Sequence, residues 1–527
     1  MLNKLLKNDW LLAVISGLLF SMAWPTYGFP LFLFFAFVPL FLIEERQIKK
    51  ASKLFFLKIY LAFFIWNLLK TWWIWNATAF GGVFAILVNS LLMTIVFLLF
   101  HFVRKRTPER IALAFFISIW IAFEKFHLNW DFSWPWLNLG NGFSEYPKWI
   151  QWYEFTGTFG GTFWVLLVNV LIYKTLSDYL KYHYLRQVYF RSFRIALWVF
   201  VPIIFSLYLY KNYQEKGAVA KVLILQPNLD PWKEKFKYTN EELAKDLVSL
   251  SDSTQADVVI APETAISQYT EIKNFAYTKA YKILKDYSLN HKTSFVTGVD
   301  FIHWYSDGDT IPETANKTKR GHWYDMYNSA VLIDDSQGFE VYHKSKLVVG
   351  AEFTPYSKFL KPLIGDFMID LGTSMGSNVT QKEPSVFQIN NSKIKLAPII
   401  CYESIYGEYV SKYVKKGANL LAVITNDGWW GNTEGHRQHF SMARLRAIEN
   451  RRDLVHSANT GISGHINQRG EIIKKLDYDK RGIILSDVRL NNTETFYTKY
   501  GDIIARIAIF MAIVLFLYSF SKKKVRL

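Results

Sequence analysis

The chain of 527 residues contains a single cysteine, Cys401. One cysteine excludes an internal disulfide, a zinc ribbon and a thioredoxin-type pair, because each of these needs at least two. In an oxidising compartment this thiol would have no partner within the chain. Its presence therefore requires an explanation other than structural cross-linking.

Charged residues are also few, at 20% of the sequence, where soluble domains carry roughly 25%. Hydrophobic residues make up 51%, which excludes a disordered chain, because disorder requires low hydrophobicity together with high charge. Glycine (28) and proline (15) are too few, and show no period, for a collagen-like or low-complexity chain. The mean hydropathy of +0.08 is nevertheless low for a protein that lies wholly in lipid. The composition thus predicts one membrane part and one water-soluble part.

Long apolar runs are scarce. Only residues 83–103 and 503–520 approach the about 20 apolar residues that cross a bilayer. Six shorter runs are residues 11–24, 31–43, 59–69, 111–123, 163–173 and 195–210. Tilting, pairing and flanking Trp and Tyr can extend such runs into spans. Because most of the runs crowd into the first 210 residues, the sequence predicts a transmembrane region of about seven helices over residues 1–213 and an eighth helix within 500–521.

Basic residues predict the orientation of these spans. They gather before the first run and after the second, fourth, sixth and eighth runs: Lys4, Lys7, Arg46, Lys49, Lys50, Lys53, Arg104, Lys105, Arg106, Arg110, Lys181, Arg186, Arg191, Arg194, Lys522, Lys523, Lys524 and Arg526. The alternate gaps, 71–80 and 125–152, are rich in tryptophan instead. Because cytoplasmic loops carry the positive charge and Trp marks the membrane interface, we expect both termini, including a basic tail at 522–527, in the cytoplasm. The block between spans seven and eight is then expected outside.

Two other interpretations of the basic N-terminus and the net charge of +17 are disfavoured. The first apolar run ends Ser21-Met22-Ala23-Trp24-Pro25, which lacks the small-x-small pattern of a signal-peptide cleavage site, so we expect it to stay attached. Much of the excess positive charge flanks the spans, and no basic run interleaves with aromatic residues in the soluble block. The sequence therefore predicts a membrane and no nucleic acid as partner.

Residues 218–492 have a different pattern, in which short β-branched runs alternate with polar stretches of helical length. The expected strands are 219–225, 257–260, 294–299, 330–333, 394–400, 420–425 and 483–488, and the expected helices are 241–250, 273–288 and 436–452. Mostly apolar strands are typical of sheets covered on both faces. The alternation predicts a layered α/β domain.

Four strand ends in this block carry reactive or polar side chains. One strand ends Ala-Pro-Glu at Glu263, another segment reads Tyr-His-Lys at Lys344, a third ends Cys-Tyr-Glu from Cys401, and a fourth ends Thr-Asn-Asp-Gly-Trp-Trp from Thr425. Singly, these residues are typical of a buried small side chain, a solvated cap and a surface lysine. Together they include a thiol and the carboxylate and ammonium groups that can activate one. Functional residues of α/β folds gather at strand ends, so we interpret Glu263, Lys344 and Cys401 as a candidate catalytic set.

These motifs, in this chain order, resemble the Glu-Lys-Cys triad of the nitrilase superfamily. A nitrilase-like domain held between seven N-terminal spans and one C-terminal span resembles the bacterial apolipoprotein N-acyltransferases, over essentially the whole chain. The resemblance implies an αββα sandwich for residues 218–492. One segment departs from the family pattern: the loop that commonly reads Leu-Val-Pro-Phe-Gly-Glu is Leu-Val-Val-Gly-Ala-Glu at 347–352, although the spacing from Lys344 to Glu352 is kept.

The resemblance also implies an activity: transfer of an acyl chain from a phospholipid to the α-amine of an S-diacylglyceryl-cysteine apolipoprotein, through a thioester on the cysteine, without metal or cofactor. This is the last step of lipoprotein maturation, at the bacterial inner membrane, with the catalytic domain facing the periplasm. Glu263 would be the general base, Lys344 the oxyanion donor and Cys401 the nucleophile. Supporting residues would be Glu352, Tyr402 and Glu403, and the lipid entrance would be lined by Trp232, Trp429 and Trp430.

Alternatives remain at this stage. A membrane-tethered nitrilase-type hydrolase would let water cleave the thioester, and a non-catalytic lipid-binding or transport protein would need charged residues along a membrane path, of which the apolar runs show few. The Gly-x-Ser-x-Gly sequence at 372–376 lacks the helix that a nucleophile elbow needs after it. His436 and His439 lie three residues apart but have no obvious third metal ligand, so we expect ordinary helix residues.

Overall fold

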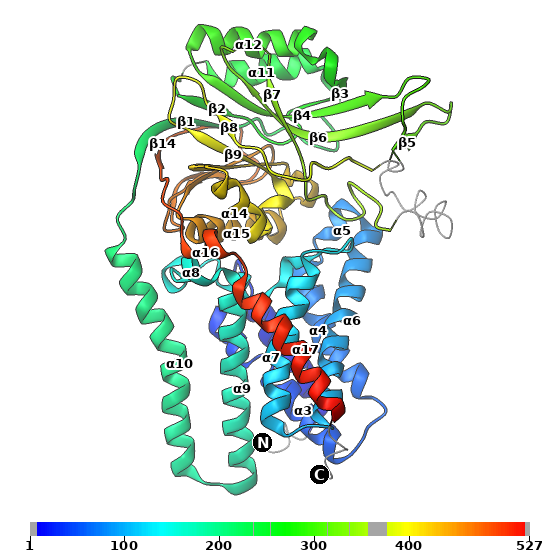
Figure 1. The fold of residues 1–527 in the computed structure, drawn as a ribbon, viewed down its shortest axis with the longest axis vertical. Helices are drawn as coiled ribbons and strands as arrows, with labels where there is room; N and C mark the ends of the chain where they lie inside the picture. The colour runs from blue at the N-terminus through cyan, green and yellow to red at the C-terminus, as the bar shows by residue number, and fades with distance from the viewer. Residues whose placement is uncertain are drawn as a thin grey trace. The chain divides into compact units, whose positions relative to one another are not determined.

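A computed structural model describes residues 8–234, 237–252, 254–312, 315–336, 338–356 and 377–521, and the chain forms two compact units (Figure 1). The helical unit comprises Met1–Trp75, Phe80–Asn212 and Tyr500–Leu527. The α/β unit comprises Asn76–Ala79 and Tyr213–Lys499. The basic tail at 522–527 and the Gly-x-Ser-x-Gly sequence at 372–376 lie outside the described residues.

Helices form around every apolar run predicted from the sequence. The longer ones are α2 (Asp9–Ala23), α3 (Val38–Lys49), α4 (Phe55–Thr71), α6 (Ala79–Arg104), α7 (Glu109–His127), α9 (Thr158–Tyr182), α10 (Leu185–Asn212) and α17 (Ile503–Ser521). The short helices α5 (Ile74–Ala77) and α8 (Tyr153–Thr156) lie between them in sequence. Within the described residues, four helices are long and apolar enough to cross a membrane, namely α6, α9, α10 and α17. The protein is thus membrane-bound, and the total of eight spans remains a prediction.

The second apolar run is not one continuous helix. It divides into the 3-10 helix η1 (Pro30–Phe35) and α3, each with a proline in its first turn. The side chain of Asn169, from α9, compensates the break: its Oδ1 accepts from the Phe37 amide at 2.8 Å and its Nδ2 donates to the Leu33 carbonyl at 2.7 Å. Irregular backbone in an apolar environment needs such partners. A hydropathy pattern alone cannot predict these hydrogen bonds from the Asn169 side chain to the broken helix.

The α/β unit is built on two sheets. The first has eight strands, ordered β14-β1-β2-β4-β6-β5 with β3 paired to β4 and β7 to β6. Its strands are β1 (Ala218–Gln226), β2 (Val258–Ile260), β3 (Ile266–Glu271), β4 (Ser294–Trp304), β5 (Asn316–Lys317), β6 (Trp323–Ile333), β7 (Glu340–His343) and β14 (Gly482–Leu490). The second has six, ordered β13-β12-β11-β10-β9-β8. These are β8 (Phe387–Gln388), β9 (Lys395–Ile400), β10 (Leu420–Thr425), β11 (Asp453–Ala458), β12 (Ser463–Ile466) and β13 (Ile472–Leu476).

Helices cover the outer face of each sheet, which gives the four layers of an αββα sandwich (Figure 1). Helices α11 (Asn240–Ser251) and α12 (Lys279–His291) pack on the first sheet, and α14 (Gly407–Lys415) and α15 (Glu434–Asn450) pack on the second. Between the sheets, the Ser457 hydroxyl of β11 donates to the carbonyls of Leu225 at 2.8 Å and Ile260 at 3.2 Å. The predicted fold class is confirmed.

Parallel strands in each sheet have their carboxyl ends at one edge, and the reactive side chains at Glu263, Cys401 and Asn426 follow such ends. In the first sheet β1, β2 and β4 are parallel, and in the second β9, β10 and β11 are parallel. The seven strands expected from apolar runs are all present. The strands that were not expected are short or polar, and they include β3, β5, β7, β8, β11, β12 and β13. A short helix α16 (Phe496–Tyr500) ends this part of the chain.

Candidate active site

The side chain of Glu263 projects from the loop that follows β2. The next residue, Thr264, has a φ of +47°, and Gly298 of β4 lies against this turn. A Cβ at Gly298 would lie 2.2 Å from the Thr264 nitrogen and 2.6 Å from the Glu263 Cα. Any larger side chain would displace the backbone of the loop. Glycine at position 298 is therefore needed for the backbone position from which the Glu263 side chain projects.

Lys344 follows β7 and lies between two carboxylates. Its Nζ is 2.9 Å from Glu263 Oε1 and 2.9 Å from Glu352 Oε1, and its side chain is 1% exposed. Asn328, from β6, donates through Nδ2 to the same two oxygens, at 2.7 and 3.0 Å. The Asn426 amide donates to Glu263 Oε2 at 3.1 Å. The base, the cation and their partners therefore form one connected and almost wholly buried network.

The charge state of the lysine is set by this network. Burial lowers the pKa of Lys344, but the charges of Glu263 and Glu352 outweigh burial and hold the pKa well above its ordinary value. The ammonium is thus permanently charged at neutral pH. A fixed positive charge in a water-poor site is the group that stabilises a developing oxyanion.

Cys401 opens the 3-10 helix η7 (Cys401–Ile405) directly after β9. Its φ is +48°, an unusual conformation for a residue with a side chain, and it is 8% exposed. Burial raises the pKa of the Cys401 thiol well above its ordinary value, and the Glu263 carboxylate raises it further against the opposing charge of Lys344. The resting thiol is therefore protonated, and it becomes a nucleophile only when a base takes its proton.

Glu403 joins the lysine loop to the cysteine turn. Its Oε1 accepts from the Tyr342 hydroxyl at 2.6 Å and the Ser345 amide at 2.6 Å, and its Oε2 accepts from the Ile400 amide at 2.8 Å. Burial raises the pKa of Glu403 to about 7, although these donors lower it. The Glu403 side chain thus binds the backbone of both the loop after Lys344 and the turn at Cys401. A group with such contacts holds the two catalytic segments in place.

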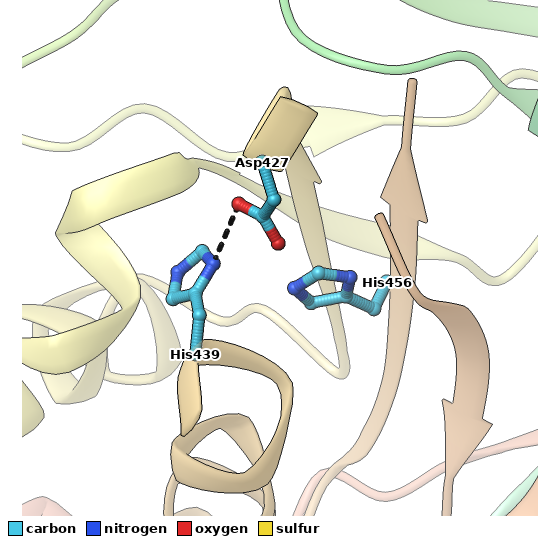
Figure 2. A group of neighbouring side chains, drawn as sticks. All are labelled: Asp427, His439 and His456. Atoms are coloured by element: carbon cyan, nitrogen blue, oxygen red, sulfur yellow. Dashed lines mark hydrogen bonds and ion pairs between the residues drawn. The ribbon is translucent and has the colours of Figure 1, made fainter. Parts of the chain in front are cut away.

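A histidine and an aspartate lie behind the cysteine. His439 Nδ1 is 3.0 Å from Asp427 Oδ1, and His439 Nε2 is 3.2 Å from the Cys401 carbonyl oxygen. Figure 2 shows His456 on the other side of Asp427. The Nδ1 of His456 lies 2.9 Å from the Ile462 carbonyl oxygen. One potential ligand atom from each of Asp427, His439 and His456 lies within 4.8 Å of the other two, and this spacing could hold a metal ion. His439 lies in α15, and its neighbours come from η8 (Asp427–Trp430) and β11, which the sequence does not place beside that helix. The expectation that His436 and His439 are ordinary helix residues stays a prediction.

Comparisons with known proteins assign the two parts of the chain to families. Residues 16–171 match the family model of the apolipoprotein N-acyltransferase N-terminal domain, and residues 224–497 match that of carbon-nitrogen hydrolases. The chain belongs to the apolipoprotein N-acyltransferase family, within the carbon-nitrogen hydrolase (nitrilase) superfamily.

Two relatives in this family match along nearly their whole length. The apolipoprotein N-acyltransferase of Chlorobaculum tepidum is 28% identical over 99% of this chain and 98% of its own. That of Thermotoga maritima is 27% identical over 95% of this chain and 92% of its own. Among solved structures, a Nesterenkonia amidase of the nitrilase superfamily aligns with 55% of this chain and 98% of its own, at 16% identity and a TM-score of 0.37.

The remaining expected site residues divide into buried and exposed sets. Tyr402 is 3% exposed, and its ring packs against Tyr406 with centroids 5.4 Å apart. Trp232 is 58% exposed and meets Trp429 edge to face at 4.8 Å. Trp430 is partly buried, with its ring 5.8 Å from that of His439. Trp232, packed on the half-buried Trp429, is an exposed apolar surface, whereas Tyr402 can act only from within the fold.

Sequence reasoning missed several residues of the site: Asn328, Ser404, Asn426, Asp427 and His439. Asn328 carried no distinctive signal, because Asp325 and Ser329 also interrupt the apolar and aromatic residues of β6. Asn426 and Asp427 stand directly after the strand at 420–425, but their position alone assigns them no role. His439 carried no local signal, since its partners are distant in the chain.

Proposed function

We propose that this chain transfers an acyl chain from a phospholipid to the α-amine of the N-terminal S-diacylglyceryl-cysteine of apolipoproteins, through a thioester on Cys401. The observation that carries the proposal is the buried Lys344–Glu263 ion pair beside a protonated thiol in a chain of this family. The family name supplies the acceptor class, a membrane-associated lipoprotein. The phospholipid donor is part of the proposal.

The first step needs a base, because the resting thiol is neutral. Glu263 accepts the proton from Cys401 as the sulfur attacks the ester carbonyl carbon of the donor. The Lys344 ammonium and the N–H donors of Asn328 and Asn426 contact its carboxylate and stabilise the form that accepts this proton. The proton transfer moves negative charge from Glu263 to the substrate, towards the lysine that already faces the site.

The tetrahedral intermediate carries its negative charge on the former carbonyl oxygen. Lys344 stabilises this oxyanion, and removal of such a donor typically slows a reaction by about 10²–10³-fold. Collapse of the intermediate breaks the ester bond, and the departing lysophospholipid alkoxide takes the proton held by Glu263. A thioester on Cys401 remains, and Glu263 is again ionised.

The second half-reaction repeats the sequence with an amine. Glu263 takes a proton as the acceptor nitrogen attacks the thioester carbon, and Lys344 stabilises the second oxyanion. The carbon–sulfur bond then breaks, and the Cys401 sulfur takes the proton from Glu263. The products are an amide on the lipoprotein and the starting enzyme.

Location and substrate access follow from the helices and the tryptophan pair. We place the enzyme in the bacterial inner membrane with the α/β unit facing the periplasm, because basic residues end α3 and α6, and Lys181 and Arg186 flank the turn between α9 and α10. Trp232 and Trp429 then offer an apolar surface for the lipid chains. Glu352 supports Lys344, and Tyr402 packs behind the nucleophile.

Discharge of the acyl-enzyme tests the proposal against a hydrolase. The purified acyl-enzyme should persist for minutes in buffer and should discharge rapidly when a diacylglyceryl lipopeptide with a free N-terminal amine is added. The matched N-acetylated lipopeptide should leave the thioester intact, because an amide nitrogen is not nucleophilic. Rapid loss of the acyl group to water, at the same rate with either peptide, would establish a hydrolase instead.

A further inference from the structure

We propose that His439 and Asp427 form a positioning pair that holds the Cys401 backbone in its left-handed conformation and keeps the charge behind the nucleophile balanced. The proposal rests on the proposed function, because it assigns the pair to the reaction of Cys401. Neither residue touches a reacting atom in this account. Both act by holding the turn at Cys401, which positions the thiol.

The contacts begin at the Cys401 carbonyl. This oxygen accepts from the Ser404 hydroxyl at 2.8 Å and lies 3.2 Å from His439 Nε2, which is itself 2.8 Å from Ser404 Oγ. A carbonyl oxygen only accepts, so His439 Nε2 carries a proton. Two donors thus fix the carbonyl of a residue whose φ of +48° is disfavoured for any side chain larger than glycine.

The other ring nitrogen is held by a carboxylate. Asp427 Oδ1 lies 3.0 Å from His439 Nδ1 and accepts from the Thr425 hydroxyl at 2.7 Å (Figure 2). Both His439 and Asp427 are 0% exposed. Because each nitrogen faces an oxygen acceptor, the geometry fits an imidazolium that bridges the Asp427 carboxylate and the Cys401 carbonyl.

The turn that follows β10 also contacts the general base, Glu263. Asn426, next to Asp427, donates its amide to Glu263 Oε2 at 3.1 Å. The turn after β10 therefore contacts the general base through its backbone and, through His439, the carbonyl of the nucleophile. A shift of this turn would displace both catalytic groups together.

The charges around the pair explain why a histidine is needed. Burial lowers the pKa of His439, but Asp427 outweighs burial and raises the pKa above its ordinary value. The Asp427 charge in turn raises the pKa of the Cys401 thiol, after the larger effects of burial and Glu263. An imidazolium cancels that aspartate charge. The titratable groups facing His439 or the thiol from neighbouring elements are Asp427, Glu263, Lys344 and His456.

His456 does not share this role. Burial lowers its pKa to about 4, and its Nδ1 faces the Ile462 carbonyl, so it is neutral with a lone pair on Nε2. Within the described residues, His456 Nε2 and Asp427 Oδ2 have no hydrogen-bond partner. A metal ion could use these two atoms, but His439 would have to supply a third lone pair, and both of its nitrogens face oxygen acceptors. The geometry favours a proton over a metal between Asp427 and His439.

Alkylation of the thiol by iodoacetamide tests the pair in the full-length protein in detergent, without any acyl donor. Cys401 is the only cysteine, so the rate reports on this thiol alone. Below the thiol pKa the rate follows the thiolate fraction. Replacement of His439 by glutamine should leave the Asp427 charge uncompensated and slow alkylation at pH 8 by about tenfold, equivalent to about one unit of thiol pKa. The double variant His439→Gln/Asp427→Asn removes both charges and should recover most of the wild-type rate.

The control is His436→Gln, one turn earlier on the same helix. His436 is also buried and neutral, but it lies by Asn432 and Tyr478 rather than by the cysteine. Its variant should alkylate at the wild-type rate. Thermal melting establishes that each protein is folded, and His439→Asn replaces His439→Gln if the latter does not fold.

Three results would overturn the proposal. They are a wild-type alkylation rate in folded His439→Gln, a double variant as slow as the single variant, and a wild-type rate that falls on treatment with EDTA and returns with Zn²⁺. The second result would refute the charge balance that the pair is proposed to provide, and the third would make the cluster a metal site. Because alkylation needs no lipid, a protein that passes this test yet forms no acyl thioester would refute the proposed function and leave the pair intact.

Discussion

At the scale of single residues, the site keeps the Cys401 thiol unreactive at rest and lets it become a nucleophile when a substrate is bound. Burial and Glu263 keep the Cys401 thiol protonated, so it is protected from adventitious reaction at rest. Lys344 keeps its charge because two carboxylates surround it. The thiolate therefore forms only when a substrate carbonyl can take the developing charge.

The lysine should matter for acylation rather than for donor binding. Lys344→Met keeps most of the stem but removes the cation, and should slow thioester formation by about 10²–10³-fold. It also leaves Glu263 and Glu352 buried without a counter-charge, so the variant should melt at a lower temperature than the wild type. Single-turnover acylation with a saturating phospholipid measures the first effect. Thioester formation at the normal rate in folded Lys344→Met would remove Lys344 from its role as oxyanion donor.

At the scale of elements, the sequence predicts strands better than the contacts between them. Strands such as β10, with apolar residues on both faces, are visible because burial on both sides leaves no polar position. β11 was missed because it contains Asp453 and His456, yet all its residues are buried. Asp453 Oδ2 lies 2.9 Å from His465 Nε2 of the neighbouring strand β12. Contacts of polar residues with distant partners are invisible in a single sequence, which is also why the contacts of His439 with Asp427 and Cys401 could not be predicted.

Glu403 offers a test of how two loops are joined. Each of its oxygens accepts from a backbone amide, of Ser345 or Ile400, so a glutamine at this position must point its NH₂ group at one of them. An unsatisfied buried donor typically costs about 1–3 kcal/mol. Glu403→Gln should therefore lower the melting temperature and disorder the lysine loop enough to reduce acylation. A variant as stable and active as the wild type would show that this link is dispensable.

The pH dependence of that variant has a defined sign. The folded pKa of Glu403 is raised to about 7 from an ordinary value of 4.5. Between these values the unfolded chain binds fewer protons than the folded one, so this residue lowers the free energy of unfolding as pH rises, and its effect levels off above about pH 7. The melting-temperature difference between wild type and Glu403→Gln should thus be largest near pH 4.5 and should narrow towards pH 7. A difference that widens over this range would contradict the raised pKa.

At the scale of the whole molecule, the orientation in the membrane remains a prediction. A reporter that is active only in the cytoplasm should work when inserted after Arg106, beyond the basic end of α6, and should fail when inserted next to Asn378 in the α/β unit. Insertions of equal length, with protein abundance measured by immunoblot, make the two positions comparable. Activity next to Asn378 would put the cysteine in the cytoplasm and reverse the proposed location.

The central claim is that the acyl chain passes through Cys401. The direct measurement is the intact mass of the purified protein after incubation with phospholipid in mixed micelles and no amine acceptor, followed by peptide mapping. We expect a mass increase of one acyl group on the peptide that contains Cys401, released by neutral hydroxylamine and absent from folded Cys401→Ser, because Glu263 is too weak a base for a serine hydroxyl. Accumulation of N-acylated lipopeptide by the wild type without any acyl adduct, or an adduct on another residue, would contradict the account.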